Sequence, residues 1–229
     1  MRVPPAAATP GPASAPLLSF ALHGRRPGSG CGSPRVNPLR ALLAAFILVA
    51  ASNEALADAE AGRVKAEPCF ACHGPGGNST QAAYPSLAEQ PKQFIVSALY
   101  QFREGKRVNP LMSPMAANLS NADLNDLAAY FSAQKLTPPA APAGPDIVAA
   151  GEKITQVNNC TACHSPQLTG QQHIPRLAGQ HREYLAAQLA AFRASTRADM
   201  DGVMTSAAQG LTPQDIAVLA EYLSGLSRP

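Results

Sequence analysis

The sequence offers little material for an ordinary hydrophobic core. It has no tryptophan in 229 residues, and aromatic residues make up only 5% of the chain. A domain of about eighty residues with so few large side chains needs another source of buried apolar bulk. No stretch alternates apolar and polar residues in the manner of a β-strand, so we expect an all-α protein.

No apolar run is long enough to cross a bilayer. The run Ala41–Ala51 follows Arg35 and Arg40 and has eleven residues, whereas a membrane-spanning helix needs about twenty. The small-x-small sequence Ala55–Ala57 comes shortly afterwards and fits a signal-peptidase site. We therefore predict that residues 1–57 are an export signal, cleaved after Ala57.

An excess of basic charge is also lacking once this segment is set aside. It holds five of the 18 lysines and arginines and one of the 15 acidic residues, so 13 basic and 14 acidic residues remain. This balance gives no basic patch for nucleic acid. The segment also contains Cys31, so the mature chain keeps four of the five cysteines.

The rest of the chain contains one unit twice. Three blocks recur in the same order with nearly constant offsets of 91, 90 and 92 residues: Cys69–His73 with Cys160–His164, Pro85–Gln90 with Pro175–Gln180, and Met112–Tyr130 with Met204–Tyr222. Such self-similarity indicates an internal duplication. The proline-rich stretch 137–145 predicts a stiff linker between domains 58–136 and 146–229.

Each copy predicts the same series of helices. The spacing of apolar residues indicates helices over 93–103 and 182–193, and we expect another helix before each cysteine motif, over 59–66 and 146–157. Ser120 with Asp123, and Thr212 with Asp215, predict capping boxes at the start of the last helix of each copy.

All four cysteines of the mature chain lie in two Cys-x-x-Cys-His motifs, the pattern of c-type haem attachment. The paired cysteines can form thioethers with the haem vinyl groups, and the adjacent histidine can bind the iron. The residues concerned are Cys69, Cys72 and His73, then Cys160, Cys163 and His164. A shared zinc site is disfavoured by the 87 residues between Cys72 and Cys160, and a redox dithiol or a disulfide would not explain the two histidines. We expect two covalently bound haem c groups, which would supply the missing apolar bulk.

The duplication selects a second iron ligand for each haem. A methionine thioether is a common partner of histidine in cytochromes c. Only Met112 and Met204 occupy equivalent positions in the two copies, so we predict that they are the distal ligands. Met115 and Met200 have no such match and are expected to serve only in packing.

Two other histidines, His173 and His181, lack counterparts in the first copy. We expect them to lie at the surface, or to contact the iron ligands without binding the iron themselves.

These motifs, with Pro-x-Leu-Ala-x-Gln at 85–90 and 175–180, resemble those of the cytochrome c4 family. The resemblance implies two class I cytochrome c domains related by pseudo-twofold symmetry. It also implies a periplasmic protein that carries electrons from a cytochrome bc complex toward a haem–copper oxidase. Loose association with the membrane remains open.

The resemblance also implies roles for individual residues. The carbonyls of Pro85 and Pro175 would accept hydrogen bonds from Nδ1 of His73 and His164. Further implied contacts are those of Leu87 and Leu177 with the haem faces, and close helix crossings at Gly62 and Gly151 beside Tyr130 and Tyr222. Glu89 departs from the glycine of the second copy, which leaves the turn geometry at that position open.

Three functions are compatible with two such haem sites. An iron held by both histidine and methionine has no free position, which favours a one-electron carrier that is not an enzyme. The alternative is a haem subunit of a periplasmic dehydrogenase of the flavocytochrome or quinoprotein type. A dihaem peroxidase is disfavoured, because it needs one open haem, whereas both copies carry a matched methionine.

Overall fold

The computed structural model describes residues 59–138 and 140–226. The predicted export signal, its cleavage site and Cys31 lie outside the described residues. Within them the secondary structure is helical, apart from one isolated bridge between Gln171 and Ile174. The prediction of an all-α fold is confirmed.

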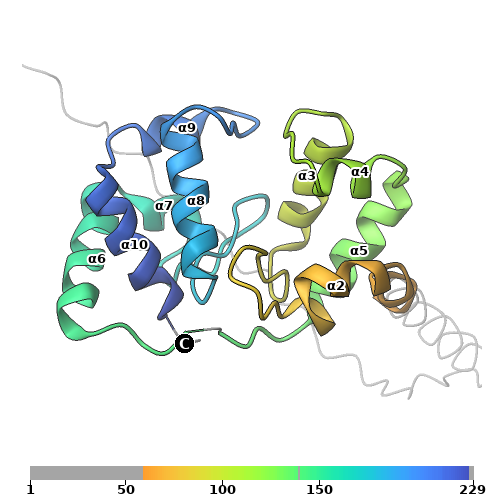
Figure 1. The fold of residues 1–229 in the computed structure, drawn as a ribbon, viewed down its shortest axis with the longest axis horizontal. Coiled ribbons are helices and arrows are strands. Elements are labelled where there is room, and N and C mark those ends of the chain that lie inside the picture. Colours follow the sequence, from red (N-terminus) through yellow and green to blue (C-terminus); the bar gives the residue numbers. More distant parts are fainter. Residues whose placement is uncertain (1–58, 139, 227–229) are drawn as a thin grey trace, which may run out of the picture. The chain divides into compact units, whose positions relative to one another are not determined.

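The two halves contain the same series of elements (Figure 1). In the N-terminal half, helical residues 59–65 are followed by η1 Glu67–Cys69, α2 Phe70–His73, η2 Pro75–Gly77, α3 Lys92–Arg103, α4 Met112–Ala116 and α5 Asn121–Ala133. In the C-terminal half the elements are α6 Pro145–Val157, α7 Cys160–His164, α8 Arg182–Arg193, α9 Val203–Ala208 and α10 Pro213–Ser224. Helix α6 begins one residue inside the predicted linker, since proline is favoured in the first turn of a helix.

Each half has its own small core, formed where α3 packs on α5 and where α8 packs on α10. In α5 the apolar stripe expected from helical spacing is buried: Leu124, Leu127, Ala128 and Phe131. The C-terminal core is the larger of the two, and α6, which packs on α10, adds apolar side chains to it.

Two glycines allow the first helix of each half to cross the last one closely. A Cβ added to Gly62 would lie 2.8 Å from Cβ of Tyr130, and one added to Gly151 would lie 2.5 Å from Cβ of Tyr222. Carbon atoms that are not bonded do not approach this closely. The close crossings implied by the resemblance are therefore present in both halves.

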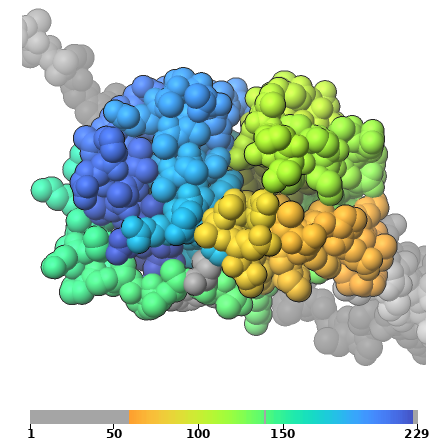
Figure 2. Space-filling model, in the orientation of Figure 1, coloured from red at the N-terminus to blue at the C-terminus, as the bar shows by residue number. Residues whose placement is uncertain are grey.

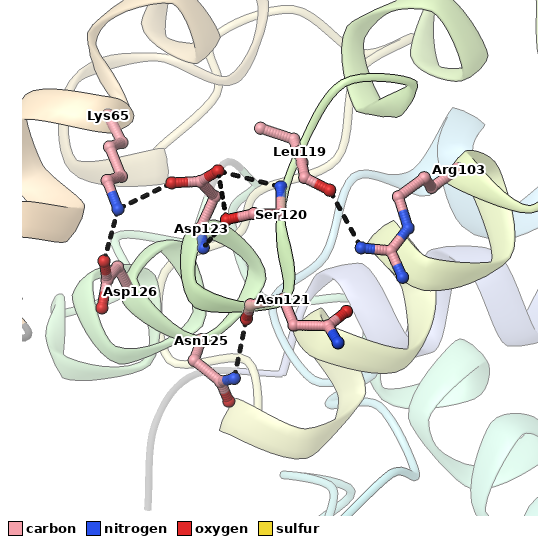
Figure 3. Close-up of polar contacts among 8 residues, drawn as sticks. All are labelled: Lys65, Arg103, Leu119, Ser120, Asn121, Asp123, Asn125 and Asp126. Carbon is pink, nitrogen blue, oxygen red and sulfur yellow. Dashed lines mark hydrogen bonds and ion pairs between the residues drawn. The ribbon is translucent and has the colours of Figure 1, made fainter.

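Both predicted capping boxes are also present. The side chains of Ser120 and Thr212 accept hydrogen bonds from the backbone N–H of Asp123 and Asp215, and each aspartate returns a bond to the backbone of its cap residue. In the N-terminal half this cap carries an additional charge. Lys65 lies 2.7 Å from a carboxylate oxygen of Asp123 and 2.5 Å from one of Asp126 (Figure 3).

The turn at Glu89 matches that of the second copy despite the change of residue. Glu89 has a φ of 56° and its counterpart Gly179 a φ of 71°, so both adopt the left-handed conformation. That conformation costs a residue with a Cβ about 1 kcal/mol. The Glu89 carboxylate lies 2.9 Å from the guanidinium of Arg176 in the other half, an ion pair that a glycine could not make.

Candidate functional site

The two Cys-x-x-Cys-His motifs fold into the short helices α2 and α7, with Cys69 directly before α2. The thiols of Cys69, Cys72, Cys160 and Cys163 are all free of disulfide bonds. Burial raises the pKa of the Cys69 and Cys160 thiols, so both are protonated near neutral pH. A pair of free thiols on one turn, beside a histidine, is the arrangement that thioether attachment of haem requires.

The histidines of the two motifs are held in the same way. Nδ1 of His73 lies 2.8 Å from the carbonyl oxygen of Pro85, and Nδ1 of His164 lies 2.8 Å from that of Pro175. A carbonyl can only accept, so in each ring Nδ1 carries the proton and Nε2 keeps its lone pair. Burial lowers the pKa of both rings. Each histidine is thus a neutral imidazole with a free Nε2, the form that binds iron.

The two matched methionines lie in the first turn of short helices, with Met112 as the first residue of α4 and Met204 as the second residue of α9. The backbone N–H of Met112 donates to Asn109 Oδ1 over 2.9 Å, and that of Met204 donates to Asp199 Oδ2 over 2.8 Å. Both side chains are half-buried, and Met204 packs on the C-terminal core. The loops before α4 and α9 therefore fix both methionines by equivalent contacts, although these contacts do not themselves assign an iron ligand.

The unmatched methionines differ from the sequence-based expectation. Met115 is 52% exposed and Met200 is 64% exposed, so neither fills a core. Met200 instead lies against the other half, where its sulfur accepts a hydrogen bond from Ser97 Oγ over 3.3 Å. That expectation rested on the lack of a counterpart in the other copy, and such a lack does not indicate whether a residue faces solvent.

Of the two unmatched histidines, His173 is exposed, whereas His181 does not lie at the surface. His181 is buried, and its Nε2 lies 2.9 Å from the carbonyl oxygen of Ser79 in the other half. The first copy has Pro91 at the corresponding position. The duplication therefore contained no indication of this contact.

A pair of arginines was missed by the sequence-based reasoning. Arg107 and Arg197 come from different halves, and each donates to Oε1 of Gln188, over 2.9 Å and 2.6 Å. Burial lowers the pKa of Arg197 to about 10, and its buried Nε has no hydrogen-bond partner among the described residues. A guanidinium with an unused buried donor, as at Arg197, suits an anion, and a haem carries two propionates. The signal was present, since each arginine lies five residues after an equivalent phenylalanine, Phe102 or Phe192.

Each half of the chain matches a family model. The model described as "Cytochrome c" matches residues 148–227, and that described as "Cytochrome C oxidase, cbb3-type, subunit III" matches residues 57–131. Cytochrome c4 of Pseudomonas aeruginosa is 40% identical over 184 residues, which span 75% of this chain and 90% of that protein. The chain belongs to the cytochrome c4 family.

Two further relatives extend the comparison. The crystal structure of reduced recombinant cytochrome c4 from Pseudomonas stutzeri superposes with a TM-score of 0.68 at 36% identity, covering 74% of this chain and 98% of that one. A thiosulfate dehydrogenase electron acceptor of Thiomonas intermedia is 35% identical over 200 residues, covering 82% of this chain and 91% of that protein.

Membership of the family settles the cofactor. The two halves are cytochrome c domains, and the protein has two covalently bound haem c groups. Its relatives are electron carriers. Among the described residues, no helix is long and apolar enough to span a bilayer.

Proposed function

We propose that this member of the cytochrome c4 family carries single electrons between periplasmic redox proteins and catalyses no reaction of its own. The carrying observation is that both histidines are neutral imidazoles whose Nδ1 proton is held by a carbonyl over 2.8 Å. Such a ring has one fixed orientation and one free nitrogen for the iron. Haem, when bound, supplies an iron that takes up and releases one electron.

The chain's own residues would hold each haem from several sides. Cys69 and Cys72 would attach the first haem and Cys160 and Cys163 the second. His73 and His164 would be the proximal ligands, and Met112 and Met204 the distal ones. Arg107 and Arg197 would receive propionates where the halves meet. A site closed on both faces excludes water and small ligands, which suits electron transfer and not catalysis.

The partners and the compartment are part of the same proposal. The sequence before residue 58 has the features of an export signal, which supports a periplasmic protein. A cytochrome bc complex and a terminal haem–copper oxidase would be donor and acceptor. The likeness to a thiosulfate dehydrogenase electron acceptor favours a second candidate function, in which a periplasmic dehydrogenase supplies the electrons.

Replacement of the methionines tests the closed sites. Oxidised wild type should show the near-infrared band of sulfur-bound ferric haem, and reduced wild type should not bind CO. Met112→Ala and Met204→Ala should each remove half of the band and admit one CO, because each opens one iron. Exposed Met115 and Met200 provide matched controls, so Met115→Ala and Met200→Ala should leave the spectra unchanged. Loss of half the band in a control variant, or CO binding by wild type at one haem, would contradict the proposal.

A further inference from the structure

The hydrogen bonds of the two histidines continue into the opposite domain. The peptide group between Pro85 and Ser86 accepts a bond from His73 through its carbonyl, and its N–H donates to Oε1 of Gln180 over 2.8 Å. One planar group thus stands between the histidine of the first domain and a glutamine of the second.

The second domain repeats this arrangement. The peptide group between Pro175 and Arg176 accepts from His164, and its N–H donates to Oε1 of Gln90 over 3.0 Å. Gln90 and Gln180 are equivalent positions of the duplication, so each copy makes the same connection to the other. Figure 2 shows atoms of the two halves in contact on the face drawn, and these bonds lie beneath that surface.

Each glutamine makes a second bond that fixes its orientation. Nε2 of Gln180 donates to the carbonyl of Ser86 over 2.9 Å, and Nε2 of Gln90 donates to the carbonyl of Arg176 over 3.1 Å. Because a backbone N–H only donates and a carbonyl only accepts, the amide oxygen must face the N–H. The contact excludes solvent, since these four residues are between 1% and 6% exposed.

We propose that Gln90 and Gln180 are positioning residues that tune, each through one peptide group, the reduction potential of the haem in the opposite domain. This inference rests on the proposed function, in which His73 and His164 are the proximal ligands. Donation of a peptide N–H to an acceptor increases the negative charge on the carbonyl of the same peptide, since hydrogen bonds in series polarise one another.

The direction of the effect follows from this polarisation. A more negative Pro85 carbonyl strengthens its bond to Nδ1–H of His73, which makes the imidazole a more basic ligand. A more basic ligand stabilises ferric over ferrous iron and lowers the reduction potential. Gln180 therefore lowers the potential of the N-terminal haem, and Gln90 lowers that of the C-terminal haem.

The test replaces each glutamine in the holoprotein with methionine, which has a similar length but no amide. In Gln180→Met the one-electron equilibrium of the N-terminal haem should shift toward the reduced form by about threefold, or about 28 mV at 59 mV per tenfold. The C-terminal haem should not move. Gln90→Met should show the reverse pattern. Potentials are measured by spectroelectrochemistry and assigned to a domain by the haem methyl resonances in NMR.

A second readout reports the hydrogen bond itself. In the reduced protein, the Nδ1 proton of His73 should move upfield in Gln180→Met, and that of His164 in Gln90→Met. Ser97→Ala is the matched control, because it removes an uncharged contact between the halves that reaches no haem ligand. It should change neither potential. If Gln180→Met is too unstable to purify, Gln180→Asn serves instead, because its shorter side chain cannot keep both bonds.

The outcomes separate this inference from the proposed function. A potential that shifts only in the opposite domain, together with its histidine proton, supports the coupling. Unchanged potentials, equal shifts in both haems, or a shift confined to the variant's own domain would overturn it. Spectra that lack histidine–methionine ligation in wild type would instead reject the proposed function.

Discussion

The two domains join the first helix to the last by different contacts at the same helix crossing. In the N-terminal domain Lys65 bridges Asp123 and Asp126, and so joins the first helix to α5 by charge (Figure 3). In the C-terminal domain the position of Lys65, three residues after the glycine of the crossing, is taken by Ile154, which packs on the core. The position of Asp126 is taken by Val218. The close helix crossing at the glycines is therefore compatible with either ionic or apolar contacts between the two helices.

The difference extends to the size of the two cores. Helix α6 has 13 residues and contributes Ile147, Val148 and Ile154 to the C-terminal core. By contrast, none of the described residues 59–65 of the first helix of the N-terminal domain joins the buried cluster, although Ala66, just beyond its end, does. Because burial of apolar area supplies most of the stability of a small domain, we expect the N-terminal domain to depend more strongly on its haem and on its charges.

The largest effects should come from filling the glycine positions. Gly62→Ala and Gly151→Ala should each lower the free energy of unfolding of their own domain by about 1–3 kcal/mol, since a Cβ would overlap atoms of the last helix. Denaturant titration of the holoprotein, followed domain by domain through the haem spectra, measures both. Gly144→Ala is the control, because nothing lies within 4 Å of a Cβ at that position.

The two glycines should nevertheless respond differently to a second change. The nearest obstacle at Gly62 is the backbone carbonyl of Asp126, whereas at Gly151 it is the side chain of Tyr222. Trimming Tyr222 to alanine should therefore relieve part of the overlap in Gly151→Ala, while Tyr130→Ala should relieve less in Gly62→Ala. Equal relief in both domains would show that the crossings are not distinguished in this way.

Smaller losses of stability should distinguish the apolar contact of Ile154 from the ionic contact of Lys65. Ile154→Ala should cost the C-terminal domain about 1–2 kcal/mol, less than for a fully buried isoleucine because this side chain is only partly buried. Lys65→Ala should cost the N-terminal domain less, since surface ion pairs are weak. At about 1 M salt the loss in Lys65→Ala should diminish, because the Debye length falls to about 3 Å. Denaturation at low and high salt measures both, and a salt-dependent loss in Ile154→Ala would contradict the distinction.

The features that could be predicted from the sequence are those encoded locally or by the duplication. The capping boxes and the buried stripe of α5 each follow from residues within one or two turns, whereas the crossing glycines were implied only by the resemblance to the cytochrome c4 family. Such patterns need no knowledge of how the halves meet.

What could not be predicted lies where one copy contacts the other. The bonds of Gln90 and Gln180 join residues 86 to 94 positions apart, and nothing in a single copy indicates them. His181 and Glu89 differ between the copies, so alignment of the copies made them look like departures. The structure shows instead that both make contacts between the halves. At these two positions a difference between the copies marks a contact between the halves, whereas Gln90 and Gln180 make such contacts although they are the same in both copies.

The smallest effect concerns the acid response of the two caps. The pKa of Asp123 lies well below its usual range, first because of Lys65 and then because of the hydroxyl and N–H of Ser120. The pKa of Asp215 is lowered by the hydroxyl and N–H of Thr212 alone. In the unfolded chain both carboxyls should titrate near about 3.9. Since both folded values are lower, each carboxylate stabilises its domain above about pH 4, and this stabilisation is lost as the pH falls through the folded pKa.

The variant Lys65→Met measures how much of the lowering of the Asp123 pKa is due to Lys65. It should raise the pKa of Asp123 toward that of Asp215 and leave Asp215 unchanged, because only Asp123 loses a cation. The N-terminal domain should then lose less stability between pH 4 and the folded pKa than it does in wild type, because less stabilisation was present above pH 4. Carboxyl carbon shifts in a pH titration of the reduced protein measure both values. Exposed Lys153 provides the control, since Lys153→Met removes the same charge from the other domain and should leave the pKa of Asp123 unchanged. If Asp123 kept its low pKa in Lys65→Met, the Ser120 cap alone would account for it, and the two domains would not differ in this respect.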